Sequence, residues 1–169
     1  SRGLGDVYKR QKQGRIILKM NALQDPAMID RLYEASEHGV QIDLIVRGIC
    51  CLIPGQSYSR NIRVTRIVDS FLEHARIWYF GNDGKPKVFM GSPDWMRRNL
   101  YRRIEAITPV LAPDLRDNLI EMLDIQLADN QKACWVDDKL QNIFKKRTPG
   151  TPAVRAQYTF YDWLNKTNS

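Results

Sequence analysis

The chain has 169 residues, with 26 Lys and Arg against 19 Asp and Glu, and therefore carries a formal net charge of +7. Its 43% hydrophobic and 27% charged residues are ordinary for a soluble globular domain and exclude a disordered polypeptide. The apolar runs fall far short of the ~20 residues of a membrane-spanning helix, and the first residues lack the apolar core of a signal peptide. Three cysteines without a C-x-x-C spacing, and two histidines, predict neither disulfides nor a zinc site. We therefore expect reduced thiols and a cytoplasmic protein.

The first elements form a strand, a helix and a second strand. Arg15–Met20 is an apolar run typical of a buried strand. Asp25 and Pro26 are a helix N-cap and a first helical residue, and Gly39 ends that helix. Residues 40–46 are a second apolar strand. A strand, helix and strand within about 30 residues predict a parallel pair covered by a helix.

The rest of the chain contains shorter elements. Apolar side chains at helical spacing predict a helix over residues 64–72, after a loop over residues 48–61. We further expect strands over residues 75–80, 87–90, 102–110 and 132–136, a short turn of helix after Gly91, an amphipathic helix from Pro113, a basic loop over residues 144–152 and a closing helix from Val154 to Leu164. This order predicts one α/β domain with a mostly parallel mixed sheet flanked by helices.

The two histidines stand in different settings. His38 precedes Gly39 at a helix end, where an imidazole complements the helix dipole, so we interpret it as structural. His74 precedes a strand, and alternation puts Arg76 on the same side of the chain. An imidazole can attack phosphorus or pass a proton, and a guanidinium can hold phosphate oxygens. This pair therefore suits phosphoryl chemistry.

Further polar residues follow the predicted parallel strands. Lys19 and Asn21 end the first strand, and Arg47 ends the second, beside Gly48. Ligands of parallel α/β sheets lie off the carboxyl ends of the strands, so these three residues are candidate phosphate ligands. We add Arg98 from a cluster of four arginines whose other members are Arg97, Arg102 and Arg103. Such clusters are usually solvated, and we expect two of the four to be so.

One spacing resembles a half-motif of the phospholipase D superfamily. His74-x-Arg76 is followed by two strands and by Gly91-Ser92-x-Asp94. The superfamily has Lys in place of Arg76, Asp in place of Phe80 and Asn in place of Asp94. These departures argue against a working phosphodiesterase, which remains the alternative.

Longer blocks resemble the C-terminal domain of the polyphosphate kinase family. They cover residues 17–23, residues 42–52 with Pro54-Gly55, residues 67–74, and residues 92–96 with Arg98-Asn99. The resemblance runs from about Arg15 to the closing helix. It implies a phospholipase D-like domain over residues 15–169, with residues 1–14 as an extension from a preceding domain.

The resemblance also implies a reaction. The family reversibly transfers the terminal phosphate of ATP to inorganic polyphosphate, with Mg²⁺, through a phosphohistidine carried on an upstream domain. His74 matches the family's second, assisting histidine, and Arg47 and Arg103 match arginines that contact the nucleotide. Mg²⁺ is bound mainly outside this part of the family, so we expect no metal site here.

These implications set the expected partners. They are ATP or ADP, polyphosphate, the upstream phospholipase D-like domain and a second copy in a homo-oligomer. We expect the isolated fragment to be inactive and the location to be cytoplasmic, and we leave open a peripheral association with membranes. The net charge of +7 also allows a non-catalytic module that binds polyanions or nucleic acid. Such a module needs exposed aromatic residues, whereas Trp78, Tyr79 and Phe80 read as core, so we expect no nucleic acid.

Overall fold

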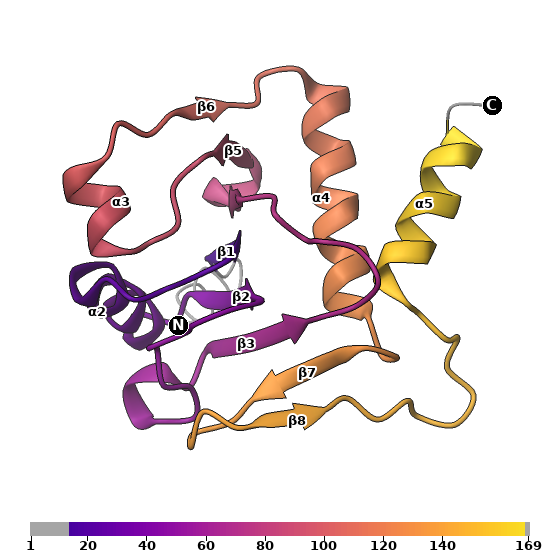
Figure 1. Ribbon diagram of the computed structural model, residues 1–169, viewed down its shortest axis with the longest axis horizontal. Coiled ribbons are helices and arrows are strands. Elements are labelled where there is room, and N and C mark those ends of the chain that lie inside the picture. Colours follow the sequence, from indigo (N-terminus) through magenta and orange to yellow (C-terminus); the bar gives the residue numbers. More distant parts are fainter. Residues whose placement is uncertain (1–13, 168–169) are drawn as a thin grey trace, which may run out of the picture.

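A computed structural model describes residues 14–167 of the chain, and the predicted extension, except for Gly14, lies outside the described residues. The elements follow in this order: β1 (Arg15–Met20), α2 (Pro26–Glu37), β2 (Gln41–Val46), η1 (Ser57–Ser59), β3 (Ile62–Ile67), β4 (Ile77–Phe80), η2 (Asn82–Gly84), β5 (Lys87–Gly91), α3 (Arg97–Arg102), β6 (Ile107–Pro109), α4 (Pro113–Ala128), β7 (Ala133–Val136), β8 (Asn142–Phe144) and α5 (Ala156–Thr167). The strands form one eight-stranded sheet in the order β6-β5-β4-β1-β2-β3-β7-β8 (Figure 1).

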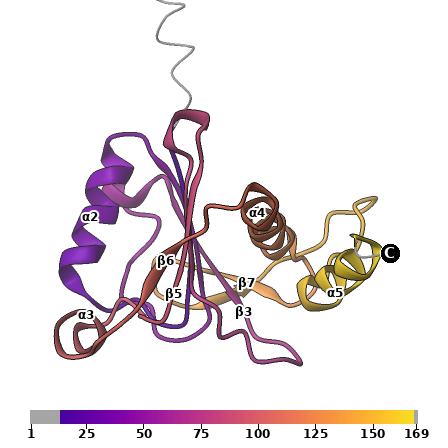
Figure 2. The same ribbon diagram turned by 90° about the horizontal axis from the view of Figure 1, so that it is seen from above.

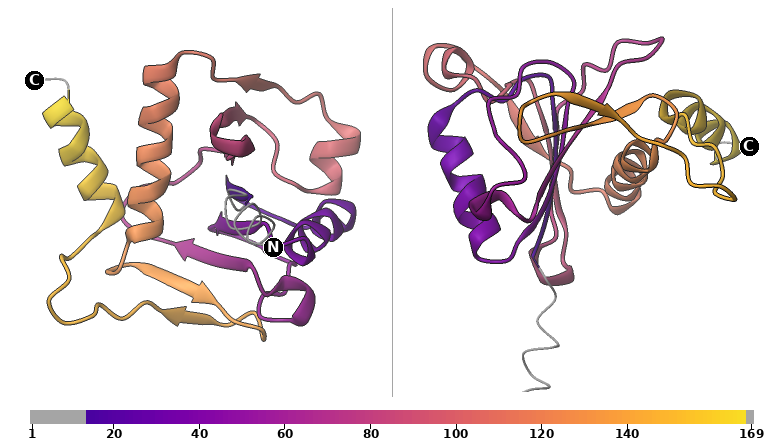
Figure 3. Two further views of the ribbon diagram at one scale, coloured as in Figure 1. Left: turned by 180° about the vertical axis from the view of Figure 1, so that it is seen from behind. Right: turned by 90° about the horizontal axis from the view of Figure 1, so that it is seen from below.

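Helices cover both faces of this sheet. Seen from above, α2 and α3 lie on one face and α4 and α5 on the other (Figure 2), and the views from behind and below agree (Figure 3). In β1, Leu18 packs with the α2 residue Leu32, whereas Ile17 packs with the α4 residue Leu123. Burial on both faces explains why the central strands are continuous apolar runs. No helix within residues 14–167 is long and apolar enough to cross a membrane.

The sheet is mixed, as predicted, but it is not mostly parallel. Only the pairs β1–β2 and β2–β3 are parallel among the described strands, and the other five pairs are antiparallel. Short connections cause this difference, because a tight turn such as the one between β4 and β5 can join only antiparallel strands. The parallel pairs lie at the centre, where the predicted strand–helix–strand unit is confirmed.

The helix predicted over residues 64–72 is wrong. Residues Ile62–Ile67 form β3, and residues 68–76 form a loop. Val64 packs on the α2 side of the sheet and Ile67 on the α4 side. A strand buried on both faces has no polar alternation, so its apolar residues also fit a helical spacing.

The other differences lie at the edges of the sheet. Residues 97–102 form the helix α3, so the strand predicted over residues 102–110 shortens to β6. The strand β8 ends at Phe144, where the basic loop was expected to begin, and pairs with β7. Both edge strands have only three residues, too few to give a periodic signal.

Candidate functional site

The chain beyond the end of β1 ties two loops together at the carboxyl edge of the parallel strands. Leu23 donates its backbone N–H to the carbonyl of Ile49 over 2.9 Å, and Trp95 donates to the carbonyl of Ala22 over 3.1 Å. Gly48 fits here because a Cβ atom at this position would lie 2.8 Å from the carbonyl oxygen of Asn21. The space beside Gly48 is therefore filled by the backbone of Asn21 and not open to a ligand. The backbone hydrogen bonds fix these loops relative to one another and so position the side chains that they carry.

Asp94 is the buried centre of the polar network at these loops. Its Oδ1 accepts hydrogen bonds from the backbone N–H groups of Asn21 and Ala22 at 2.7 and 3.2 Å. Arg76 binds the same carboxylate with two nitrogens, Nη2 at 2.9 Å from Oδ2 and Nε at 3.2 Å from Oδ1. Burial alone would raise the pKa of Asp94, but the bonds from Arg76 and the backbone outweigh it and lower the pKa. Asp94 is therefore an ionised anchor.

This network reaches His74 through Arg47. The Asn21 side chain donates to Asp94 over 3.2 Å and accepts the Arg47 Nε–H over 2.8 Å. The Nη2 of Arg47 lies 3.4 Å from Nδ1 of the exposed His74 imidazole. Because a guanidinium only donates, Nδ1 accepts this bond and a neutral ring carries its proton on Nε2. The Nη1 of Arg76 also donates to the His74 carbonyl oxygen, over 3.0 Å.

Next to His74, a buried ion pair fixes Glu73. The Lys19 Nζ lies 3.0 Å from Oε2 of Glu73, and Lys19 is only 3% exposed. Gln126 of α4 donates to the same oxygen over 3.1 Å. Burial lowers the pKa of Lys19, and the charge of Glu73 opposes that shift. The charged group of Lys19 thus faces a carboxylate in the interior.

The turn after β5 is held from within the protein. The amides of Gly91 and Ser92 donate to the carbonyls of Arg76 and Ala106. The Ser92 hydroxyl contacts Glu105 and accepts the Ala106 N–H over 3.1 Å. A Cβ atom on Gly91 would lie 2.7 Å from the ring of Trp78, so glycine here makes room for packing. The amides of this turn are therefore engaged within the protein and are not open to a ligand.

The predicted site residues divide into two groups. The network joins Asn21, Arg47, His74 and Arg76, and Lys19 adjoins it through Glu73. Arg98 in α3 and Arg103 at the end of α3 are exposed, and within residues 14–167 no hydrogen bond or ion pair joins them to the network.

Two contributors are absent from the predicted set. Asp94 was visible in the Gly-Ser-x-Asp motif, but its burial and its bond to Arg76 were not. Nothing local marks Glu73, whose partners lie on β1, α4 and α5.

The carboxylates beside His74 do not fit a magnesium ion. Asp94 is occupied by Arg76 and two backbone N–H groups, and Glu73 by Lys19 and Gln126. In the part of the chain that the structure describes, no group of three His, Cys, Asp or Glu residues could hold a metal ion. Asp94 and Glu73 are therefore engaged by protein groups and not placed as metal ligands.

Arg47 has the character of an anion ligand. It pairs with no carboxylate among residues 14–167, in contrast to Lys19 and Arg76. With residues 67–73 it lines a pocket of about 220 Å³ beside the His74 loop. An imidazole and an unneutralised guanidinium thus lie together at the carboxyl edge of the parallel strands.

The fold is phospholipase D-like. The structure of a phospholipase D family member, Nuc from Salmonella typhimurium, matches with a TM-score of 0.52 and 16% identity, over 67% of this chain and 77% of that one. The family is more specific. Residues 5–157 match the family described as polyphosphate kinase C-terminal domain 2, and the chain belongs to that family. The predicted family is confirmed, and so is the predicted mixed sheet flanked by helices, although that sheet is not mostly parallel.

Two relatives show how much of a longer protein this chain represents. The polyphosphate kinase of Halalkalibacterium halodurans is 47% identical over 162 residues, which are 95% of this chain and 23% of that protein. The crystal structure of polyphosphate kinase from Porphyromonas gingivalis is 56% identical, with a TM-score of 0.91, over 96% of this chain and 25% of that one. The chain therefore spans about a quarter of the length of these relatives.

Proposed function

We propose that the chain is the His74-bearing domain of a polyphosphate kinase, a transferase that reversibly moves the terminal phosphate of ATP to inorganic polyphosphate. The contact between the His74 imidazole and Arg47, at the carboxyl edge of the parallel strands, carries this proposal. The names of the relatives support it. The nucleophilic histidine belongs to another domain of a longer polypeptide.

Charge stabilisation is the main task of such a site. A transferring phosphoryl group spreads negative charge over its oxygens, so catalysis consists mostly of positioning and electrostatic stabilisation. Arg47 binds these oxygens with its guanidinium, which is always charged and can hold two oxygens at once. The Nε2–H of His74 donates to an oxygen of the transferring or leaving phosphate. The P–N bond then forms on the other domain as the bond to the leaving oxygen of ADP breaks.

The remaining predicted ligands take two roles. Arg76, Lys19 and Asn21 act as positioning residues, because their polar groups are engaged by Asp94, Glu73 and Arg47. Arg98 contacts phosphates of the ligand and Arg103 contacts the nucleotide, and the exposure of both side chains suits these roles. Mg²⁺ would be bound mainly outside this fragment. The upstream domain, a homo-oligomer and a cytoplasmic location remain predictions.

A paired measurement of turnover and stability tests this function. In the full-length protein, His74→Ala should lower kcat by about 10²–10⁴-fold, the range typical of lost acid–base help. Arg47→Lys should also lower kcat, because an ammonium cannot replace a bidentate guanidinium. Both variants should keep the melting temperature, because His74 is exposed and Arg47 only half-buried.

His38→Ala is the matched control, because the other histidine caps α2 by a bond to the Glu34 carbonyl. It should leave turnover unchanged. Normal turnover in His74→Ala would end the assignment, and so would a fall in melting temperature with normal activity of the folded fraction.

A further inference from the structure

The loop that carries His74 buries little apolar surface of its own. Residues 68–76 contain no helix or strand. Val68, Phe71 and Leu72 are 68%, 64% and 73% exposed, so the loop inserts no large apolar side chain into the core. Loops with so little burial open readily unless polar contacts hold them. The position of His74 therefore depends on such contacts.

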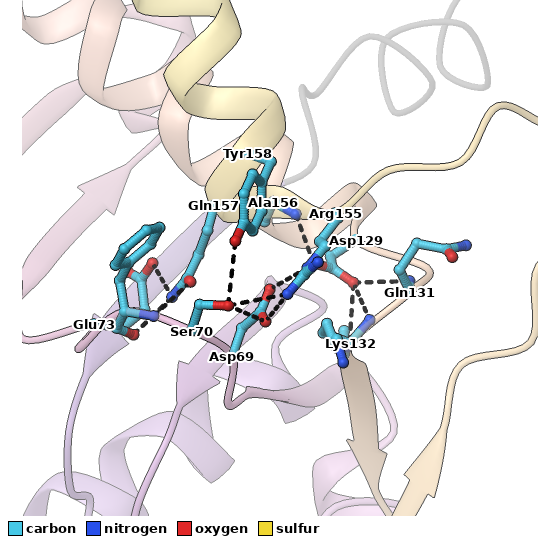
Figure 4. A network of polar contacts seen from close by, with 12 residues as sticks. Asp69, Ser70, Glu73, Asp129, Gln131, Lys132, Arg155, Ala156, Gln157 and Tyr158 are labelled. Carbon is cyan, nitrogen blue, oxygen red and sulfur yellow. Dashed lines mark hydrogen bonds and ion pairs between the residues drawn. The ribbon is translucent and has the colours of Figure 1, made fainter.

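The first turn of α5 supplies them, from more than 80 residues further along the chain (Figure 4). The Gln157 side-chain amide pairs with both backbone groups of Phe71: Oε1 accepts the N–H over 2.8 Å, and Nε2 donates to the carbonyl over 2.7 Å. The same Nε2 lies 3.1 Å from Oε1 of Glu73, the residue before His74. Gln157 is only 9% exposed, so water competes little for these bonds.

A second contact fixes the other end of the loop. Arg155 binds the carboxylate of Asp69 through Nε at 2.8 Å and Nη2 at 2.6 Å, and it also donates to the Ser70 hydroxyl at 3.0 Å (Figure 4). The guanidinium lies 4.3 Å from the ring centroid of Tyr158. The hydrogen bonds from Arg155 lower the pKa of Asp69. Asp69 is therefore ionised at neutral pH.

The start of α5 is itself anchored to the sheet. The buried carboxylate of Asp129 accepts the Ala156 N–H over 2.7 Å (Figure 4). It also accepts the N–H of Ala133, the first residue of β7, over 3.0 Å. The His74 loop is thus bonded to the start of α5, which is itself bonded to the sheet through Asp129. Glu73 connects the loop to the sheet a second time, because its carboxylate binds Gln157, Gln126 and Lys19 of β1.

We infer that Gln157 is a positioning residue for His74, holding the imidazole loop against Arg47 by clamping the backbone of Phe71 and the carboxylate of Glu73. This inference rests on the proposed function of His74. A displacement of ~1 Å at a reacting group can cost about 10²-fold in rate. The contact between His74 and Arg47 is already 3.4 Å long, so a small shift of the loop breaks it.

The first test measures the clamp in the 169-residue chain. Gln157→Met keeps the size of the side chain and removes all three hydrogen bonds. Phe160→Leu is the matched control, because Phe160 lies one turn along α5, stacks on Trp163 and packs against the apolar cluster. We expect hydrogen exchange at the Phe71 amide to accelerate at least ~10-fold in Gln157→Met and to stay unchanged in Phe160→Leu. Equal protection in both variants would overturn the clamp.

The second test measures turnover in the full-length protein. Gln157→Met should lower kcat by about 10- to 100-fold with a small change in KM for ATP, because positioning acts on the transition state. Phe160→Leu should keep kcat at a comparable loss of melting temperature. If Gln157→Met does not fold, Gln157→Asn replaces it, since the shorter amide cannot reach both Phe71 groups.

His74→Ala, measured alongside, separates the two hypotheses. If His74→Ala is inactive and the Gln157 variant keeps normal kcat, the clamp is wrong and the function stands. If His74→Ala is fully active, the proposed function itself fails.

Discussion

Arg76 and Asp94 form a pair whose members depend on each other. Their side chains are 14% and 8% exposed, so each charge is largely withdrawn from water. Removing one partner of such a pair leaves an uncompensated charge, which is strongly destabilising. The superfamily half-motif resembled by this sequence has Lys and Asn at the two positions, which makes one charge instead of two. The two departures from that motif therefore belong together, because Arg76 and Asp94 pair with each other. This pairing occupies the guanidinium, so it is not available to bind a substrate.

A double-mutant cycle tests this dependence. Arg76→Lys and Asp94→Asn should each destabilise the chain, and the double variant should recover part of the loss. The expected coupling in the free energy of unfolding is about 1–3 kcal/mol. The control cycle is Arg31→Lys with Glu34→Gln, an exposed pair worth roughly 0.5 kcal/mol or less. Additive effects at Arg76 and Asp94 would show that they do not act as a pair.

The same carboxylate predicts a dependence on pH. Because the pKa of Asp94 is lowered in the folded chain, its contribution to stability is full above the unfolded value of about 3.9 and is lost as the pH falls through the folded value. Urea unfolding of the wild type and Asp94→Asn should therefore differ most near neutral pH and converge below about pH 4. Asp162→Asn, an exposed site on α5, is the control and should match the wild type throughout. A difference that stays constant with pH would contradict the ionised anchor.

The sequence predicts site residues only where the place of a residue at a strand end also determines its neighbours in the folded chain. Arg47 and Asn21 were predicted because the carboxyl ends of neighbouring parallel strands meet at one edge. Glu73 and Gln157 lie 84 positions apart, and no local pattern states that they touch. The structure brings Lys19 and Arg76 to the same region as Arg47, but their carboxylate partners depend on the packed core.

At the scale of elements, local signals decided which predictions succeeded. Asp25 caps α2 through the Met28 N–H, as the Asp-Pro pair predicts, and this helix and its flanking strands are confirmed. The strand β3 has no such signal, and the spacing of its apolar residues predicts part of a helix. Its β-branched residues favour a strand, but a spacing that fits a helix masks that preference.

The interior of β3 gives a direct prediction. Thr65 is fully buried, and its hydroxyl has no hydrogen-bond partner among the described residues. Thr65→Val removes this unpaired group, keeps the shape and the β-branching, and should stabilise the chain by about 1 kcal/mol. Thr108→Val on the exposed edge strand β6 is the control, with an expected change near zero. Thermal melts of both variants decide, and a loss of stability in Thr65→Val would mean that the hydroxyl is paired.

At the scale of the whole molecule, the two histidines lie near opposite ends of the strand β2. His38 follows α2, three residues before β2 begins, and its Nδ1 lies 2.8 Å from the Glu34 carbonyl oxygen. His74 contacts Arg47, which follows the end of β2. The six residues of β2 separate these two ends by about 20 Å, at ~3.3 Å per residue. A nucleophile must approach phosphorus to roughly 3–3.5 Å, so His38 cannot attack a phosphate held by His74.

This separation predicts that the 169-residue chain alone binds its ligands but does not turn over. The sequence contains no third histidine, so a phosphohistidine intermediate at this site needs a residue from elsewhere. Incubation with labelled ATP should give neither polyphosphate synthesis nor acid-labile phosphate on His38, while polyphosphate should still bind weakly and be released by salt. Arg47→Lys should weaken that binding, which distinguishes a folded site from general attraction to a positive chain. Addition of the upstream part of the same protein should restore label transfer in the wild type and much less in His74→Ala. Robust synthesis by the chain alone would contradict the proposal that the nucleophilic histidine lies on another domain.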